Sequence, residues 1–150
     1  MITQKSAEAE PAYKNETPAM NDSDFVELCK EGSLQQINDA IANGANVNAK
    51  IIDTGWTALM NAACRNNPEA VTALLNAGAD VNAKDKDGTA ALMYAVCVNP
   101  QTVTALLNAG ADVNARNQKG VTALMQAVRN NNPEIISVLL NAGAAPNAKK

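Results

Sequence analysis

The chain contains no histidine, and aromatic residues make up only 3% of its 150 residues. Without histidine it lacks the side chain that most often exchanges protons near neutral pH. It also has no glycine-rich phosphate-binding loop and no pair of carboxylates expected on facing elements. With so few aromatic residues, the core has to be built from Ala, Leu, Val and Ile, which suits closely stacked thin helices. These absences favour a helical protein that is not an enzyme.

Cysteine is also scarce, with Cys29, Cys64 and Cys97 far apart in the sequence. An odd number of cysteines cannot form a complete disulfide framework, and their spacing matches no zinc site. We therefore expect reduced thiols and neither a metal nor another cofactor. One enzymatic alternative stays open, in which Cys64 or Cys97 acts as a nucleophile. Such a thiol needs an activating base, and the neighbouring side chains are amides and Arg65.

Long apolar runs and runs of one charge are absent as well. No apolar segment reaches the length of a transmembrane helix, and the N-terminal MITQKSAEAEP lacks the apolar stretch of a signal peptide. We expect a cytoplasmic protein, with a secreted or periplasmic location as the alternative if a signal peptide has been removed. The net charge is −3 and no run of Lys or Arg forms a basic stripe, so neither nucleic acid nor a membrane is an expected partner.

The sequence does contain one short motif in four copies, which we call the repeated phrase: NGANVNAK, NAGADVNAK, NAGADVNAR and NAGAAPNAK. Their glycines, Gly44, Gly78, Gly110 and Gly143, are spaced 34, 32 and 33 residues apart. Repetition at this period is typical of a solenoid, in which each short unit stacks on its neighbours. A solenoid offers an extended surface rather than an enclosed pocket, so the pattern indicates a binding protein.

Two short helices are expected in each unit. In the second unit Leu59, Ala62 and Ala63 lie at i, i+3 and i+4, and a second set that starts at Val71 repeats this spacing. The second helix should begin at an Asn-Pro pair, because Asn accepts a backbone N–H bond at a helix start and Pro lacks the N–H that would stay unpaired there. It should end at the glycine of the repeated phrase, where a left-handed residue is favoured. The pairs are Asn67-Pro68, Asn99-Pro100 and Asn132-Pro133.

The units resemble the ankyrin repeat. The matching segments are GWTALMNAA with VTALLNAGADVNA, GTAALMYAV with VTALLNAGADVNA, and GVTALMQAV with ISVLLNAGAAPNA, preceded by a diverged terminal unit, DFVELCKEGSLQQINDAIANGANVNA. The resemblance implies an all-α solenoid of stacked helix-turn-helix units with projecting loops or hairpins, over residues 22–150. We expect units at about 22–50, 51–84, 85–116 and 117–150, after a disordered polar tail over 1–21. The TALM and NNPE segments are similar to the corresponding segments of bacterial ankyrin proteins.

Departures from the family pattern affect local packing. Ankyrin repeats usually read T-P-L-H at the start of the first helix, whereas these units read T-A-L-M or A-A-L-M. Met60, Met93 and Met125 thus replace a histidine whose hydrogen bonds join neighbouring repeats in the family, and apolar packing is expected instead. Ala90 removes the Thr that would cap the first helix of the third unit, so we expect that unit to be locally looser.

The two ends of the solenoid are expected to differ. Gln36 and Asp39 of the first unit align with mostly small or apolar residues of later units, which indicates that these positions face the preceding repeat. The first unit is therefore expected to be a polar cap. No comparable cap is evident in the fourth unit, where Val128 is expected to be partly exposed. A second copy of the chain or another partner would cover it, so a homodimer is the alternative to the expected monomer.

By resemblance, a protein partner binds on the concave face, defined here as the projecting loops and the inner side of each unit's first helix. These are also the positions at which the otherwise similar units differ most. Trp, Tyr and Arg most often dominate interfaces; Tyr94 is expected to be exposed, whereas Trp56 has the alternative of packing across the neighbouring loop. The predicted contact residues are Asp53, Thr54, Trp56, Asn61, Arg65, Lys86, Asp87, Tyr94, Gln118, Lys119, Gln126 and Arg129, with Thr89, Val98, Val121 and Asn130 at matching positions.

These features together predict a non-enzymatic protein–protein interaction module. One alternative is a structural scaffold that self-associates through its C-terminal repeat. Another is an inhibitor or adaptor of a neighbouring enzyme.

Overall fold

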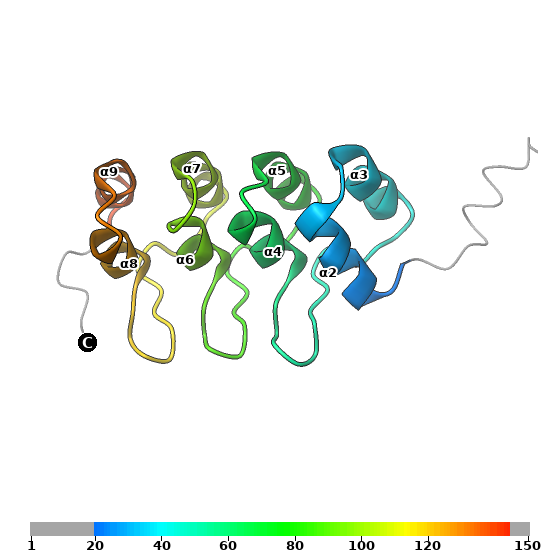
Figure 1. The fold of residues 1–150 in the computed structure, drawn as a ribbon, viewed down its shortest axis with the longest axis horizontal. Coiled ribbons are helices and arrows are strands. Elements are labelled where there is room, and N and C mark those ends of the chain that lie inside the picture. The colour runs from blue at the N-terminus through cyan, green and yellow to red at the C-terminus, as the bar shows by residue number, and fades with distance from the viewer. Residues whose placement is uncertain (1–19, 145–150) are drawn as a thin grey trace, which may run out of the picture.

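The computed structural model describes residues 20–144, which fold into eight helices arranged as four pairs. The pairs stack side by side in one row, and the loops between pairs project from the side of the first-helix layer (Figure 1). The first helices are α2 (Asp22–Glu31), α4 (Ala58–Cys64), α6 (Ala91–Ala95) and α8 (Ala123–Arg129). The second helices are α3 (Leu34–Ala42), α5 (Pro68–Asn76), α7 (Pro100–Asn108) and α9 (Pro133–Asn141). This architecture confirms the predicted all-α solenoid, while most of the predicted tail lies outside the described residues.

The second helices begin where the Asn-Pro pairs predict. The side chains of Asn67, Asn99 and Asn132 each accept a hydrogen bond from a backbone N–H in the first turn, at 3.2, 2.7 and 3.1 Å. Proline occupies the first turn of all three helices. Each helix ends just before a glycine with a φ of about +100°, a conformation that a side chain would strain. Local capping chemistry therefore sets the length of these helices at nine residues.

The first helices differ in how they begin. Thr57 and Thr122 accept hydrogen bonds from the backbone N–H groups of Met60 and Met125, at 3.1 and 3.2 Å. Ala90 occupies the same place before α6 and provides no side-chain cap, as predicted. The helix that follows has five residues, whereas α4 and α8 have seven.

Helix pairs bury small and aliphatic side chains against each other. Met60 and Met93 lie in this core, 0% and 4% exposed, which confirms that apolar packing replaces the histidine of the family pattern. Met125 in the last repeat is 40% exposed, because no described helix pair follows it. At the other end Gln36 and Asp39 are exposed, so the first repeat presents the predicted polar surface.

Neighbouring loops are held together through their backbones. The N–H of Lys86 donates to the carbonyl of Thr54, and the N–H of Gln118 donates to that of Asp87, both at 3.0 Å. Gly55 has a φ of +77°, and a Cβ there would lie 3.0 Å from the backbone nitrogen of Lys86. Close approach of successive loops therefore depends on glycine at this position.

Candidate functional site

The predicted contact residues fall into three groups by exposure. Eight are exposed to solvent, at loop tips or at the ends of the first helices. Trp56, Tyr94 and Gln126 are half-buried, and Asn61 is buried. The exposed members are Asp53, Thr54, Arg65, Lys86, Asp87, Gln118, Lys119 and Arg129.

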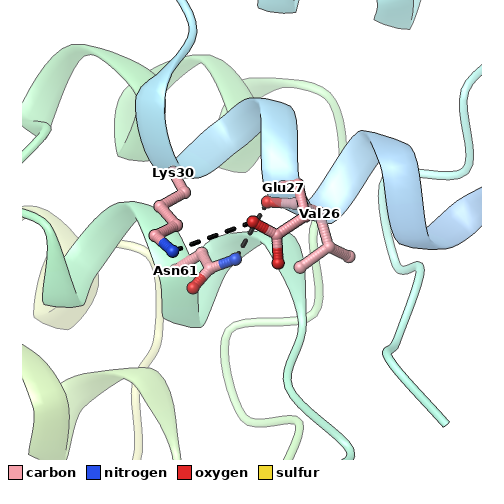
Figure 2. Close-up of polar contacts among 4 residues, drawn as sticks. All are labelled: Val26, Glu27, Lys30 and Asn61. Carbon is pink, nitrogen blue, oxygen red and sulfur yellow. Dashed lines mark hydrogen bonds and ion pairs between the residues drawn. The ribbon is translucent and has the colours of Figure 1, made fainter.

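Asn61 is a correction to the predicted contact surface. Its side chain is only 5% exposed, because α2 packs directly on α4. The amide nitrogen Nδ2 donates to the carbonyl oxygen of Val26 on α2 at 2.9 Å (Figure 2). This hydrogen bond joins the first two repeats. In the family pattern a histidine, which Met60 replaces here, was expected to make such a link.

The two aromatic residues pack on each other across the second and third repeats. The ring centroids of Trp56 and Tyr94 lie 4.7 Å apart, with the ring planes inclined at 48°. Trp56 therefore packs on the neighbouring repeat, as in the alternative considered from the sequence, but its indole contacts Tyr94 on helix α6. The expectation that Tyr94 is exposed is wrong, because the indole covers part of its ring and its hydroxyl forms a hydrogen bond with Asp85.

The hydroxyl of Tyr94 donates to the carboxylate of Asp85, a contact that the sequence did not reveal. Asp85 is 8% exposed and also accepts bonds from the N–H groups of Asp87 and Thr89, at 2.9 and 3.0 Å. Burial, together with this carboxylate, raises the pKa of Tyr94 above its ordinary range. Asn117 occupies the position of Asp85 one repeat later and accepts the equivalent bonds from the N–H groups of Lys119 and Val121. This equivalence is the sequence feature that could have indicated a structural role for Asp85.

Between the third and fourth repeats the concave face contains a hollow of about 430 Å³. We call it the Cys97 hollow, after the exposed thiol in its wall. Two cationic side chains line it and no carboxylate does. The lining residues are Thr89, Met93, Tyr94, Cys97, Asn117, Lys119, Val121, Gln126 and Arg129. Sequence reasoning selected several of these positions but did not indicate that they enclose a shared space.

A second hollow, of about 630 Å³, lies on the outer helices α3, α5 and α7. Leu34, Thr72 and Ala105 are among its lining residues, and Glu69 is the single charged one. It lies outside the predicted contact surface and provides a comparison surface for mutagenesis.

The three thiols are free and differ in exposure. Cys29 is buried, Cys64 is half-buried and Cys97 is exposed. Burial raises the pKa of the Cys29 thiol to about 12. Over residues 20–144 no cluster of three His, Cys, Asp or Glu side chains is arranged to hold a metal ion. No helix in that part of the chain has the length and apolarity needed to cross a membrane.

Comparisons with known proteins place these repeats in a family. A pattern described as "Ankyrin repeats (3 copies)" matches residues 25–117, and "Ankyrin repeats (many copies)" matches residues 106–150. Human mitochondrial disaggregase is 39% identical over 71 residues, 47% of this chain and 10% of that protein. The Notch protein of Drosophila melanogaster is 39% identical over 71 residues, again 47% of this chain but 3% of that protein. The 2-5A-dependent ribonuclease of Mus musculus is 30% identical over 84 residues, 56% of this chain and 11% of that protein.

The chain thus spans about a tenth or less of these relatives, and the repeats are what it shares with them. Two of the three have the names of enzymes, although ankyrin repeats are typically non-enzymatic modules that mediate protein–protein interaction. The repeated glycine phrase, the stacked helix pairs and the matches over 25–150 agree, and the chain belongs to the ankyrin repeat family.

Proposed function

We propose that this chain is a non-enzymatic protein-binding module that recognises its partner on the concave face. The single observation that carries the proposal is the clustering of exposed side chains that differ between otherwise similar repeats. Arg65, Lys86, Lys119 and Arg129 are all exposed at loop tips or first-helix ends. Arginine and large aromatic residues contribute most of the binding energy in many interfaces.

Preorganisation of this face supports the proposal. The backbone bonds between successive loops hold the loop tips in place before a partner arrives. The Trp56–Tyr94 pair is already packed, so its rings lose little conformational freedom on binding. Ordering of loops and side chains is a main cost of association, and a face ordered in advance avoids part of it.

The effect on a partner would follow from occupying its surface. An inhibitor or adaptor of an enzyme acts in this way, and either role is compatible with a module that carries no chemistry of its own. The partner's identity decides between them.

The test is to capture partners on the immobilised protein and on two triple variants. Trp56→Ala/Arg65→Ala/Lys86→Ala changes the concave face. Gln35→Ala/Glu69→Ala/Gln101→Ala changes three exposed residues of the outer helices and is the matched control. Circular dichroism confirms that each variant is folded.

We expect a protein that the wild type and the outer-helix variant retain and the concave-face variant loses. The opposite pattern would move the site to the outer helices. Equal retention by all three would contradict the proposed face.

A second candidate function is self-association through the fourth repeat. Val128 is 58% exposed and Leu140 is 43% exposed, whereas Val96, at the position of Val128 in the third repeat, is 1% exposed. The fourth repeat therefore presents to solvent an apolar surface that earlier repeats bury. A scaffold built on this contact would join two copies at their C-terminal repeats.

A further inference from the structure

We propose that the Cys97 hollow binds an acidic side chain of the partner, so that the docking segment is a peptide carrying Asp or Glu. This inference rests on the proposed function and adds the chemistry of what the concave face recognises. It follows from the charge, the hydrogen-bonding groups and the size of the hollow.

The charge of the hollow is opposite to that of the chain. Lys119 and Arg129 line it, and among the described residues neither forms an ion pair. The chain as a whole has a net charge of −3, so these two cations form a local positive region on an acidic protein. Both cations are exposed, so each is available to attract an anion that reaches the edge of the hollow.

Nearby carboxylates offset only part of this charge. Asp85 is 8% exposed and does not line the hollow, and its carboxylate faces the Tyr94 hydroxyl and two backbone N–H groups. Asp87 is exposed and, with Lys119, borders a separate hollow of about 200 Å³. It weakens the positive potential at Lys119 and leaves the Arg129 side of the Cys97 hollow as the stronger anion site.

Gln126 in the wall and Asn130 beside the hollow are uncharged hydrogen-bond donors. The Sγ atom of Cys97 lies 3.7 Å from Nε2 of Gln126 and 3.4 Å from Nδ2 of Asn130, and both amides donate to it. A thiol sulfur is a weak acceptor, and each amide nitrogen carries a second N–H. A carboxylate oxygen is a much stronger acceptor, so an entering carboxylate would gain donors that are at present poorly used.

The size and the apolar part of the lining favour a peptide. A volume of about 430 Å³ accommodates one or two side chains, and Met93 and Val121 provide apolar contact for their methylene groups. A nucleic acid would need several cations along its phosphate backbone, and this hollow offers two. An acidic peptide therefore fits the surface better than a polyanion does.

The experiment uses a phage library of random dodecapeptides selected on the immobilised protein. We expect the selected peptides to be enriched in Asp and Glu. A selected peptide is then synthesised with a fluorescent label, together with a twin in which each Glu or Asp is replaced by the amide. Fluorescence anisotropy measures the affinity of both peptides for the wild type and for two double variants.

Lys119→Gln/Arg129→Gln removes the two cations of the hollow. Lys30→Gln/Lys50→Gln makes the same change of net charge in the first repeat; Lys30 pairs with Glu27 at the surface at 3.8 Å, a contact that contributes little to stability (Figure 2). We expect the first variant to weaken binding of the acidic peptide about tenfold and the control to change it less than about twofold. The amide twin should bind the wild type and the hollow variant equally.

Several results would overturn the inference. Suppose that the selected peptides are not enriched in Asp and Glu, and that they bind the wild type but not Trp56→Ala/Arg65→Ala/Lys86→Ala. This result would contradict the acidic ligand and leave the proposed function standing. If both double variants weaken binding of the acidic peptide equally, the loss of affinity would follow from the change in net charge and not from the hollow. Tighter binding of a dodecameric oligothymidylate than of any selected peptide would replace the peptide by a nucleic acid. No selected peptide at all, or peptides insensitive to every concave-face change, would contradict both proposals.

Discussion

Asn61 makes a side-chain hydrogen bond that links the first two repeats, and its removal should cost stability. We expect Asn61→Ala to lower the free energy of unfolding by about 1–2 kcal/mol, because the Val26 carbonyl loses a buried donor. Urea denaturation followed by circular dichroism measures the change. Gln126→Ala, at the equivalent position in the fourth repeat, is the control because Gln126 donates to the sulfur of Cys97, a weak acceptor. Equal losses in the two variants would show that the bond to Val26 adds nothing.

The Cys29 thiol should make stability depend on pH in the alkaline range. Its pKa is about 12 in the folded protein against an ordinary value of 9.0, because burial disfavours the thiolate. Between these values the folded state binds one proton more than the unfolded state. This contribution to stability is therefore complete below pH 9 and is lost as the pH rises toward 12.

The measurement compares urea denaturation of Cys29→Ala, Cys64→Ala and the wild type at a pH of about 8 and about 11. The wild type and Cys64→Ala should lose more stability over this interval than Cys29→Ala does. Parallel losses in all three proteins would mean that Cys29 does not titrate with a raised pKa.

Burial of individual side chains was the part that the sequence could not predict. Asn61, Tyr94 and Gln126 occupy equivalent positions, yet the first is buried and the other two are half-buried. Their exposure depends on what the neighbouring repeat and its loop place over them. Repeat alignment alone therefore assigned Asn61 to the surface and missed the contact between Tyr94 and Asp85.

Among the helices, α6 offers the clearest opportunity for stabilisation. Ala90 has φ and ψ of −98° and 168°, nearly the same as the −98° and 167° of Thr57, which caps α4. Threonine at this position should therefore accept a bond from the backbone N–H of Met93. We expect Ala90→Thr to raise the free energy of unfolding by about 1 kcal/mol, measured by urea denaturation.

The reciprocal change provides the control for this prediction. Thr122→Ala should lower stability by a similar amount, because it removes the cap of α8. A loss of stability in Ala90→Thr would mean that the loop before α6 has no room for the larger side chain.

Helix boundaries were predictable because they depend on local chemistry. The Asn-Pro pairs and the glycines act on the chain within a few residues of themselves, so the starts and ends of α5, α7 and α9 could be located from the sequence. The Cys97 hollow could not, since it arises from the space between two helices and two loops of different repeats. Its volume depends on packing, which no single segment specifies.

For the whole molecule, the contrast between the two ends determines how copies could associate. The first repeat presents Gln36 and Asp39 to solvent, and head-to-tail stacking would bury these polar groups against the apolar surface of the fourth repeat. A tail-to-tail dimer buries the apolar surfaces of two fourth repeats against each other and leaves both polar ends in water.

The exposed apolar surface is small, so the dimer should be weak and the mass should depend on concentration. Met125, Val128 and Leu140 are 40%, 58% and 43% exposed, and we expect a dissociation constant on the order of 10–100 µM. Sedimentation equilibrium should show the wild type shifting from monomer to dimer across this range.

Val128→Lys should stay monomeric, because a lysine at the centre of the contact would be desolvated without a partner. Ser137→Lys is the matched control, since Ser137 and its counterparts Thr72 and Thr104 are exposed in every repeat and face away from the stacking direction. A wild type that is monomeric at every concentration would leave the concave face as the one proposed route of association.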